Sequence, residues 1–222
     1  MMTVNIKKFS QSDLKFANEF LSSFNANKVC LHPSDTIPGL TCHPYSQNAI
    51  NALKLIKQER KKKVFISLVK DFQTAKKYWM TLPGKWDKII AELWPNLLTI
   101  IWKATDKAPS SLIASDGSIA LRCPKFECLP AWFGKVLLDI DTLLLTTSVN
   151  NSNCPALVNW DEAVKFLESY GGFVPSTNIT PSGHVKASTV IKIEDACNYI
   201  LLREGACKKN QIDDVIAKYS IC

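Results

Sequence analysis

The sequence lacks the short motifs by which several large enzyme classes hold phosphate or activate water. The P-loop pattern G-x-x-x-x-G-K-[ST] is absent, as are G-x-G-x-x-G, G-x-S-x-G and H-E-x-x-H. No segment has the signature of an RNA-recognition motif. Any nucleotide chemistry would therefore depend on lysine, arginine, hydroxyl and backbone groups, with magnesium carried by the phosphates rather than by a protein cage.

Metal-binding and disulfide patterns are also missing. The eight cysteines include no C-x-x-C pair, and the three histidines do not lie near cysteines at ligand spacing. Cys42 and His43 are adjacent, but neighbours on an extended chain point to opposite faces, so the sequence predicts no metal site there. Reduced thiols in a cytoplasmic protein are the expected state.

Long apolar runs are absent too. No segment approaches the roughly 18 apolar residues of a membrane span, and the first residues, MMTVNIKKFSQSDLKF, contain no uninterrupted apolar stretch of the kind found in secretory signals. We therefore expect no membrane contact. Low-complexity tracts are missing as well, and 46% of the 222 residues are hydrophobic, which is enough for the core of one domain.

Positive charge is what the sequence has in excess. Its 27 Lys and Arg against 20 Asp and Glu give a formal net charge of +7. Such a surplus suits nucleic acid, anionic nucleotides or polyphosphate as partners. It is also common in ordinary basic enzymes, so charge alone favours none of these.

Hydrophobic periodicity predicts helices interspersed with strands along a single domain, residues 1–222. Helices are expected at about 12–24, 47–57, 71–80, 85–94, 128–138, 159–172 and 210–219. Strands are expected at about 28–31, 64–69, 97–104, 118–123, 143–148, 188–193 and 199–203. Some neighbouring strands leave no room for a crossover helix, so the predicted fold class is α/β, with a mixed sheet and helices packed on it.

Four polar clusters fall at the ends of predicted strands, where a rigid sheet can hold a ligand site. They are Ser34-Asp35-Thr36 in VCLHPSDTIPGL, the basic segment KQERKKK (57–63), Arg122 after SIAL, and TTSVNNS (146–152). Hydroxyls and amides hydrogen-bond polar ligands, and Lys and Arg neutralise carboxylate and phosphate.

Each cluster also has a purely structural explanation: a local turn, a solvated corner or a closed loop. For Ser34 and Asp35 alone, a turn bonded to the local backbone is the simpler reading. Arg122, between Leu121 and Cys123 at the end of a core strand, is expected to have a fixed anionic partner, either a ligand or a group of the protein.

Seven segments match, in order, the motifs of one known family. HPSDTIPGL resembles P-T-D-T-x-Y-G-L, LKLIKQERKKKVFISLV resembles I-K-x-R-x-x-x-K-P-L, and ELWPNLLTIIWKA resembles W-P-G-P-L-T. SIALRCP resembles V-x-V-R-x-P, TTSVNNSNCPA resembles T-S-A-N-x-S-G-x-P, ASTVIKI resembles S-T-V-V-D, and ILLREGA resembles I-L-R-x-G-A. Between about Val29 and Ala206, roughly four-fifths of the chain, the sequence thus resembles the YrdC-like threonylcarbamoyl-AMP synthase family.

The resemblance implies a synthase that condenses L-threonine, bicarbonate and ATP to threonylcarbamoyl-adenylate and pyrophosphate. A separate tRNA threonylcarbamoyl transferase would then use the product to modify tRNA, and whether this chain also contacts tRNA is left open. The implied fold is a single α/β domain, a twisted mixed sheet around a deep, positively charged cavity. Mg²⁺ would arrive on the ATP phosphates, and no metal ligand is assigned in the protein.

The resemblance also assigns roles to individual residues. Threonine would be bound by Ser34, Thr36 and Arg122, and ATP by Lys57, Arg60, Lys63, Ser148, Asn150, Ser188 and Arg203. Catalysis would fall to Lys57, Arg60 and Arg122, which would act by positioning and charge neutralisation rather than as general bases.

The sequence departs from the family pattern at several of these positions. Ser34 replaces a threonine, Pro38 stands where the family has an aromatic residue, and Glu59 occupies the expected arginine position of the K-x-R pair. Either Arg60 turns in from the next position or the phosphate contact is weaker. Two alternatives therefore stay open: an RNA-binding YrdC-like protein without synthase activity, and a related enzyme that forms a carbamoyl-adenylate from carbamoyl phosphate.

Overall fold

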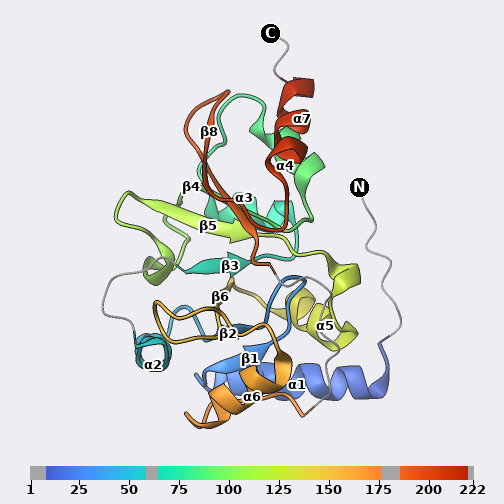
Figure 1. Ribbon diagram of the computed structural model, residues 1–222, viewed down its shortest axis with the longest axis vertical. Coiled ribbons are helices and arrows are strands. Elements are labelled where there is room, and N and C mark those ends of the chain that lie inside the picture. Colours follow the sequence, from blue (N-terminus) through green and yellow to red (C-terminus); the bar gives the residue numbers. More distant parts are fainter. Residues whose placement is uncertain (1–8, 59–64, 177–185, 220–222) are drawn as a thin grey trace.

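The computed structural model describes residues 9–58, 65–176 and 186–219. In that part of the chain the strands form one eight-stranded sheet in the order β1-β2-β6-β3-β5-β4-β7-β8, which Figure 1 shows rising from β1 near the bottom to β8 near the top. The pairs β3–β5 and β4–β7 are parallel and the other neighbouring pairs antiparallel. The predicted mixed α/β sheet is therefore confirmed.

The strands are short, and most of the predicted ones occur within a few residues of their expected bounds. They are β1 Cys30–His32, β2 Gly39–Thr41, β3 Ile66–Leu68, β4 Leu98–Lys103, β5 Ser118–Arg122, β6 Leu144–Ser148, β7 Thr189–Ile193 and β8 Tyr199–Arg203. Only β2 was not expected, because it follows Pro38 directly and is too short to show a period-2 pattern. It forms because Leu40 pairs with Leu31 on one side and with Thr147 on the other.

The helices lie on the sheet at the predicted positions, with ends shifted by a few residues. They are α1 Gln11–Asn25, α2 Gln47–Lys57, α3 Phe72–Tyr78, α4 Trp86–Leu93, α5 Ala131–Asp139, α6 Trp160–Glu168 and α7 Lys209–Tyr219. Asn159 caps the N-terminus of α6, since its Oδ1 accepts hydrogen bonds from the backbone N–H groups of Asp161 and Glu162. None of the described helices has the length and apolar character needed to cross a membrane.

Successive residues of a strand point to opposite faces of the sheet, and their side chains pack into two apolar cores. Cys30 and Leu144 pack with side chains of α1 and α5, whereas Leu31 and Leu145 belong to the larger core, to which α2, α3 and α4 contribute. On β6 the residues Leu144, Thr146 and Ser148 share one face of the sheet. This face therefore changes from apolar at Leu144 to polar at Thr146 and Ser148, and the polar part carries the site.

Candidate functional site

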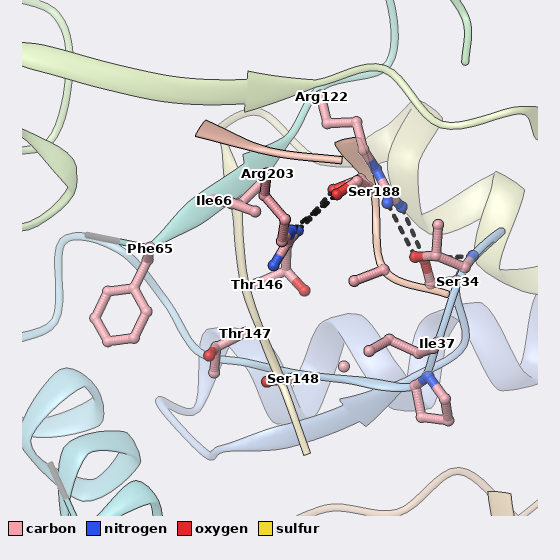
Figure 2. A pocket seen from close by; sticks show the side chains of 14 residues that line it. Ser34, Ile37, Phe65, Ile66, Arg122, Thr146, Thr147, Ser148, Ser188 and Arg203 are labelled. Atoms are coloured by element: carbon pink, nitrogen blue, oxygen red, sulfur yellow. Dashed lines mark hydrogen bonds between the residues drawn. The ribbon is translucent and has the colours of Figure 1, made fainter. Parts of the chain in front are cut away.

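A pocket of about 120 Å³ opens over the polar part of the sheet (Figure 2). Its walls come from the β1–β2 loop and from the ends of β3, β5, β6, β7 and β8. The lining residues are Ser34, Thr36, Ile37, Pro38, Gly39, Phe65, Ile66, Arg122, Thr146, Thr147, Ser148, Ala187, Ser188 and Arg203. Segments that are far apart in the sequence thus meet here, as expected for loops held at strand ends.

Six of the ten residues predicted from the sequence line this pocket: Ser34, Thr36, Arg122, Ser148, Ser188 and Arg203. Lys57 and Asn150 lie outside its lining. The remaining two, Arg60 and Lys63, fall outside the described residues.

Arg122 ends β5 and is fixed by the loop that joins β1 to β2. Its guanidinium pairs with the buried carboxylate of Asp35 and donates hydrogen bonds to Ser34 Oγ (2.8 Å) and Thr36 Oγ1 (2.9 Å), which come from the loop seen beside it in Figure 2. The other oxygen of Asp35 accepts a hydrogen bond from the backbone N–H of Lys125 (2.9 Å). The anionic partner expected for Arg122 is therefore a carboxylate of the protein itself.

The charge of Arg122 is balanced, but its hydrogen bonding is incomplete. The side chain is 5% exposed and that of Asp35 is 0% exposed, so both charges are out of water. Within the described part of the chain, Arg122 Nε is a buried donor without a hydrogen-bond partner. A buried donor of this kind carries a desolvation cost.

The stretch around Ser34 is both a turn and a wall of the pocket. The backbone N–H of Thr36 donates to Ser34 Oγ (3.2 Å), which is the local turn bonding that the sequence suggests. The same hydroxyl accepts from Arg122 of β5. The turn thus presents the two hydroxyls to the pocket, and the two readings of the sequence are compatible.

Arg203 ends β8 and brings a second positive charge to the pocket. Its guanidinium donates to the carbonyl of Ser188 from Nε (3.0 Å) and from a terminal nitrogen (2.8 Å), the bonds drawn in Figure 2. Among the described residues, no carboxylate forms an ion pair with it. Burial and, secondarily, the positive charge of Arg122 lower the pKa of Arg203 below its ordinary value. An anion in the pocket would relieve this uncompensated charge.

Ser188 is held in place from both sides. Its hydroxyl is hydrogen-bonded to Thr99 Oγ1 of β4 (2.9 Å), and its carbonyl accepts hydrogen bonds from the guanidinium of Arg203. Ser188 therefore connects β4, β7 and the end of β8 at the pocket wall.

Lys57 and Asn150 meet beside the pocket. Lys57 ends α2 with no exposed surface, and its ammonium donates to the carbonyl of Ser148 (2.6 Å) and to Asn150 Oδ1. Asn150 also accepts from Ser148 Oγ (2.7 Å) and donates to the carbonyl of Cys154 (2.6 Å). In this structure Lys57 fixes the turn after β6, and the contact with a triphosphate expected for it stays a prediction.

Sequence reasoning missed His32 and gave Thr146, part of a named polar cluster, no role of its own. His32 ends β1, has no exposed surface and stacks on Phe133 of α5 with ring centroids 5.0 Å apart. Its Nδ1 is 2.8 Å from the carbonyl of Pro33 and its Nε2 is 2.8 Å from Thr146 Oγ1. Burial lowers the pKa of His32 to about 4, opposed by the hydrogen bond to Pro33 and reinforced by the charge of Arg122. A lone histidine before a proline gives no spacing signal, whereas Thr146 lay within the quoted segment TTSVNNS.

Gly39 is required by the close approach of these two side chains. A Cβ atom at this position would lie 2.4 Å from His32 Nε2 and 2.7 Å from Thr146 Oγ1, distances that side chains do not tolerate. The glycine of HPSDTIPGL thus makes room for the histidine–threonine contact between β1 and β6.

The described residues do not fit a metal held by the protein. They contain no group of three or more His, Cys, Asp or Glu side chains that would bind a metal ion. Asp35, the carboxylate between Ser34 and Thr36, is already occupied by Arg122 and by the N–H of Lys125.

Comparison with known proteins finds one family. The family model Sua5_yciO_yrdC, described as "Telomere recombination", matches residues 22–205. A threonylcarbamoyl-AMP synthase of Pseudoalteromonas translucida is 30% identical over 177 residues, covering 77% of this chain and 88% of the relative. Another, from Photorhabdus laumondii subsp. laumondii, is 25% identical over 190 residues, covering 83% of this chain and 94% of the relative.

A solved structure has the same fold. The crystal structure of P. abyssi Sua5 complexed with L-threonine superimposes with a TM-score of 0.81 at 17% identity, over 96% of this chain. This chain spans 60% of that longer one.

Proposed function

Because the chain belongs to the Sua5_yciO_yrdC family, we propose that it is an L-threonylcarbamoyladenylate synthase. It would condense L-threonine, bicarbonate and ATP to threonylcarbamoyl-AMP and pyrophosphate. The product would pass to a separate tRNA threonylcarbamoyl transferase in the cytoplasm, where ATP and tRNA are both present. Curated relatives of similar length that carry this name support the proposal.

The observation that carries the proposal is the uncompensated charge of Arg203 in a pocket lined with hydroxyls. The ion pair with Asp35 neutralises Arg122, whereas the hydrogen bonds of Arg203 within the described part of the chain all go to Ser188. All three substrates of the proposed reaction carry negative charge, on the phosphates of ATP, the carboxylate of threonine and bicarbonate, and they match such a pocket. A pocket for an uncharged ligand would not need the charge of Arg203.

The proposed reaction has two bond-forming steps. The neutral amine of threonine attacks the carbon of bicarbonate, from which water leaves, or the carbon of CO₂, with loss of a proton from nitrogen to solvent, and forms a carbamate. A carbamate oxygen then attacks the α-phosphorus of ATP, and the bond to pyrophosphate breaks. Holding the reactants in line can supply about 7–11 kcal/mol of the barrier, and fixed cations stabilise the charge that develops on the phosphate.

The residue assignments are part of this proposal. Threonine would contact Ser34, Thr36 and Arg122. ATP would contact Ser148, Asn150, Ser188 and Arg203, together with Lys57, Arg60 and Lys63. Lys57, Arg60 and Arg122 would stabilise the transition state. Mg²⁺ would be bound by the phosphates of ATP, since the described residues offer it no carboxylate cluster.

Incubation of the purified protein with ATP, L-threonine and bicarbonate tests the function. We expect a compound with the mass of threonylcarbamoyl-AMP, formed together with pyrophosphate and dependent on both threonine and bicarbonate. A folded protein that yields no threonine-dependent product would contradict the proposal. Replacing bicarbonate with carbamoyl phosphate in the same assay separates the synthase from the carbamoyl-adenylate alternative.

The RNA-binding alternative makes a different prediction. A protein that binds RNA without synthase activity would bind RNA tightly, lose affinity steeply with added salt, and have no affinity for ATP. A tRNA titration at two salt concentrations beside an ATP titration separates the two. ATP binding that tRNA does not displace would favour the synthase.

A further inference from the structure

The hydrogen bonds of His32 fix the direction in which the Thr146 hydroxyl points. The carbonyl of Pro33 can only accept a hydrogen bond, so the Nδ1 atom 2.8 Å away carries the ring proton. In the neutral ring Nε2 is then an acceptor. The hydroxyl of Thr146, 2.8 Å from Nε2, therefore donates its only proton to the histidine.

Thr146 Oγ1 consequently offers the pocket only lone pairs. The hydroxyl hydrogen of Thr146 is donated to His32 Nε2, and Thr146 lines the pocket. Ser34 differs, because its oxygen already accepts from Arg122 and from the N–H of Thr36. The lone pairs of Ser34 are thus used within the protein, whereas Thr146 remains an acceptor for a ligand.

Several contacts hold this histidine–threonine pair in place. Phe133 stacks on the buried ring at an interplanar angle of 14°. Gly39 leaves the space that any side chain would fill. A hydroxyl bound to a ring that cannot rotate keeps its lone pairs in one direction, which makes Thr146 a pre-organised acceptor.

We propose that Thr146, oriented by His32, accepts a hydrogen bond from the amino group of the amino-acid substrate. This inference rests on the proposed function and concerns the same pocket. An α-amino acid carries an anionic carboxylate and a donor amino group, and the pocket offers arginine donors together with the acceptor hydroxyl of Thr146. Ser148, whose hydroxyl proton is likewise used, on Asn150 Oδ1, is the residue that the proposed function assigns to ATP. Arg122 is the proposed donor to the carboxylate, and Thr146 is an acceptor for an N–H of the amino group.

The contact would also orient the amino group for reaction. One N–H held by Thr146 restricts rotation about the Cα–N bond and directs the nitrogen toward the carbon that it attacks. His32 is a positioning residue in this account, because it touches Thr146 and not the substrate.

Binding measurements on two ligands test the inference. L-threonine and 3-hydroxybutanoate, which lacks the amino group, are titrated into wild type, Thr146→Val and Thr146→Ser. Loss of a hydrogen bond to a charged amino group corresponds to roughly a 10- to 100-fold loss of affinity. We expect Thr146→Val to lower the affinity for threonine by this factor and the affinity for 3-hydroxybutanoate by less than about threefold. Thr146→Ser should bind both ligands nearly as tightly as wild type does.

Two further variants complete the experiment. Thr41→Val makes the same substitution in β2, outside the pocket lining, and is expected to change neither affinity. His32→Phe keeps an aromatic ring against Phe133 but frees the hydroxyl of Thr146, and is expected to reduce discrimination between the two ligands. A structural role alone would weaken both ligands equally.

The outcomes separate this inference from the function on which it rests. If wild type binds threonine and Thr146→Val binds it as tightly, the inference is wrong and the proposed function stands. If Thr146→Val lowers the affinity for both ligands by the same factor, the amino group of threonine is not the partner of Thr146. If folded wild type binds neither threonine nor ATP, the proposed function fails and the inference fails with it.

Discussion

Arg122 and Arg203 both reach the pocket from the end of a strand, yet their surroundings differ. Arg122 is buried, paired with Asp35 and bonded to two hydroxyls of the β1–β2 loop. Arg203 has no carboxylate partner among the described residues and is bonded to Ser188. The region around Arg122 therefore uses its charge to build the pocket, and the region around Arg203 leaves its charge for a ligand.

The largest expected effect comes from breaking the first region. Arg122→Met leaves the carboxylate of Asp35 buried without its partner, so we expect the free energy of unfolding to fall by about 3–5 kcal/mol. Urea unfolding at pH 7 measures this. The double variant Arg122→Met/Asp35→Leu removes both charges and should recover a large part of the loss. Equal losses in the single and double variants would show that the pair does not act as a unit.

His32 adds a pH dependence to the same region. The unfolded histidine binds a proton below about pH 6.5, whereas the folded one, with its pKa lowered to about 4, stays neutral. The unfolded state thus gains the proton first, and stability falls as the pH drops from about 6.5 to 4, by about 3 kcal/mol in total. The pKa of His43 is also lowered by burial and contributes in the same direction.

His32→Phe should remove most of this pH dependence. Unfolding curves of wild type and variant at pH 7 and pH 5 provide the measurement. The loss of stability between the two pH values should be much smaller in the variant. Parallel losses in the two proteins would mean that other groups carry the pH dependence.

The second region should respond in binding rather than in stability. Arg203→Ala removes a charge for which the described residues provide no carboxylate partner, so we expect the free energy of unfolding to change by less than about 0.5 kcal/mol. ATP affinity should fall by about 10- to 100-fold, the value of a hydrogen bond to a charged group. Lys15→Ala, which removes an exposed lysine of α1, is the control for net charge. A loss of affinity in the control equal to that in Arg203→Ala would place the effect outside the pocket.

The smallest effect concerns an unpartnered polar group away from the pocket. Thr41 Oγ1 is buried in β2 without a hydrogen-bond partner among the described residues. Thr41→Val replaces this hydroxyl with a methyl group of similar size, and we expect the free energy of unfolding to rise by up to about 1 kcal/mol. Thermal unfolding is sensitive enough to detect it. A clear loss of stability would show that the hydroxyl has a partner.

The sequence predicted the elements well because their apolar periodicity is local. α2 has its expected bounds, Gln47–Lys57, and β8 has its expected bounds, Tyr199–Arg203. β2 was missed because three residues after a proline carry no periodic signal. Its existence depends on pairing with β6, more than a hundred residues later.

The site was predictable in its residue types but not in its contacts. The hydroxyls and arginines of the motifs do line the pocket, yet nothing near Asp35 in the sequence indicates a partner 87 residues away. The sequence likewise gives no indication that the ammonium of Lys57 is hydrogen-bonded to Asn150, or that His32 is hydrogen-bonded to Thr146. Such pairs are set by strand order in the sheet, and local pattern does not determine strand order.

The most direct test of the central claim measures threonine-dependent release of pyrophosphate from ATP by wild type and by Arg203→Ala. Both proteins are first shown to have the same unfolding free energy. We predict that wild type releases pyrophosphate only when threonine and bicarbonate are present, and that Arg203→Ala does so at least tenfold more slowly at limiting ATP. Threonine-independent release, or equal rates in the two proteins, would contradict the account.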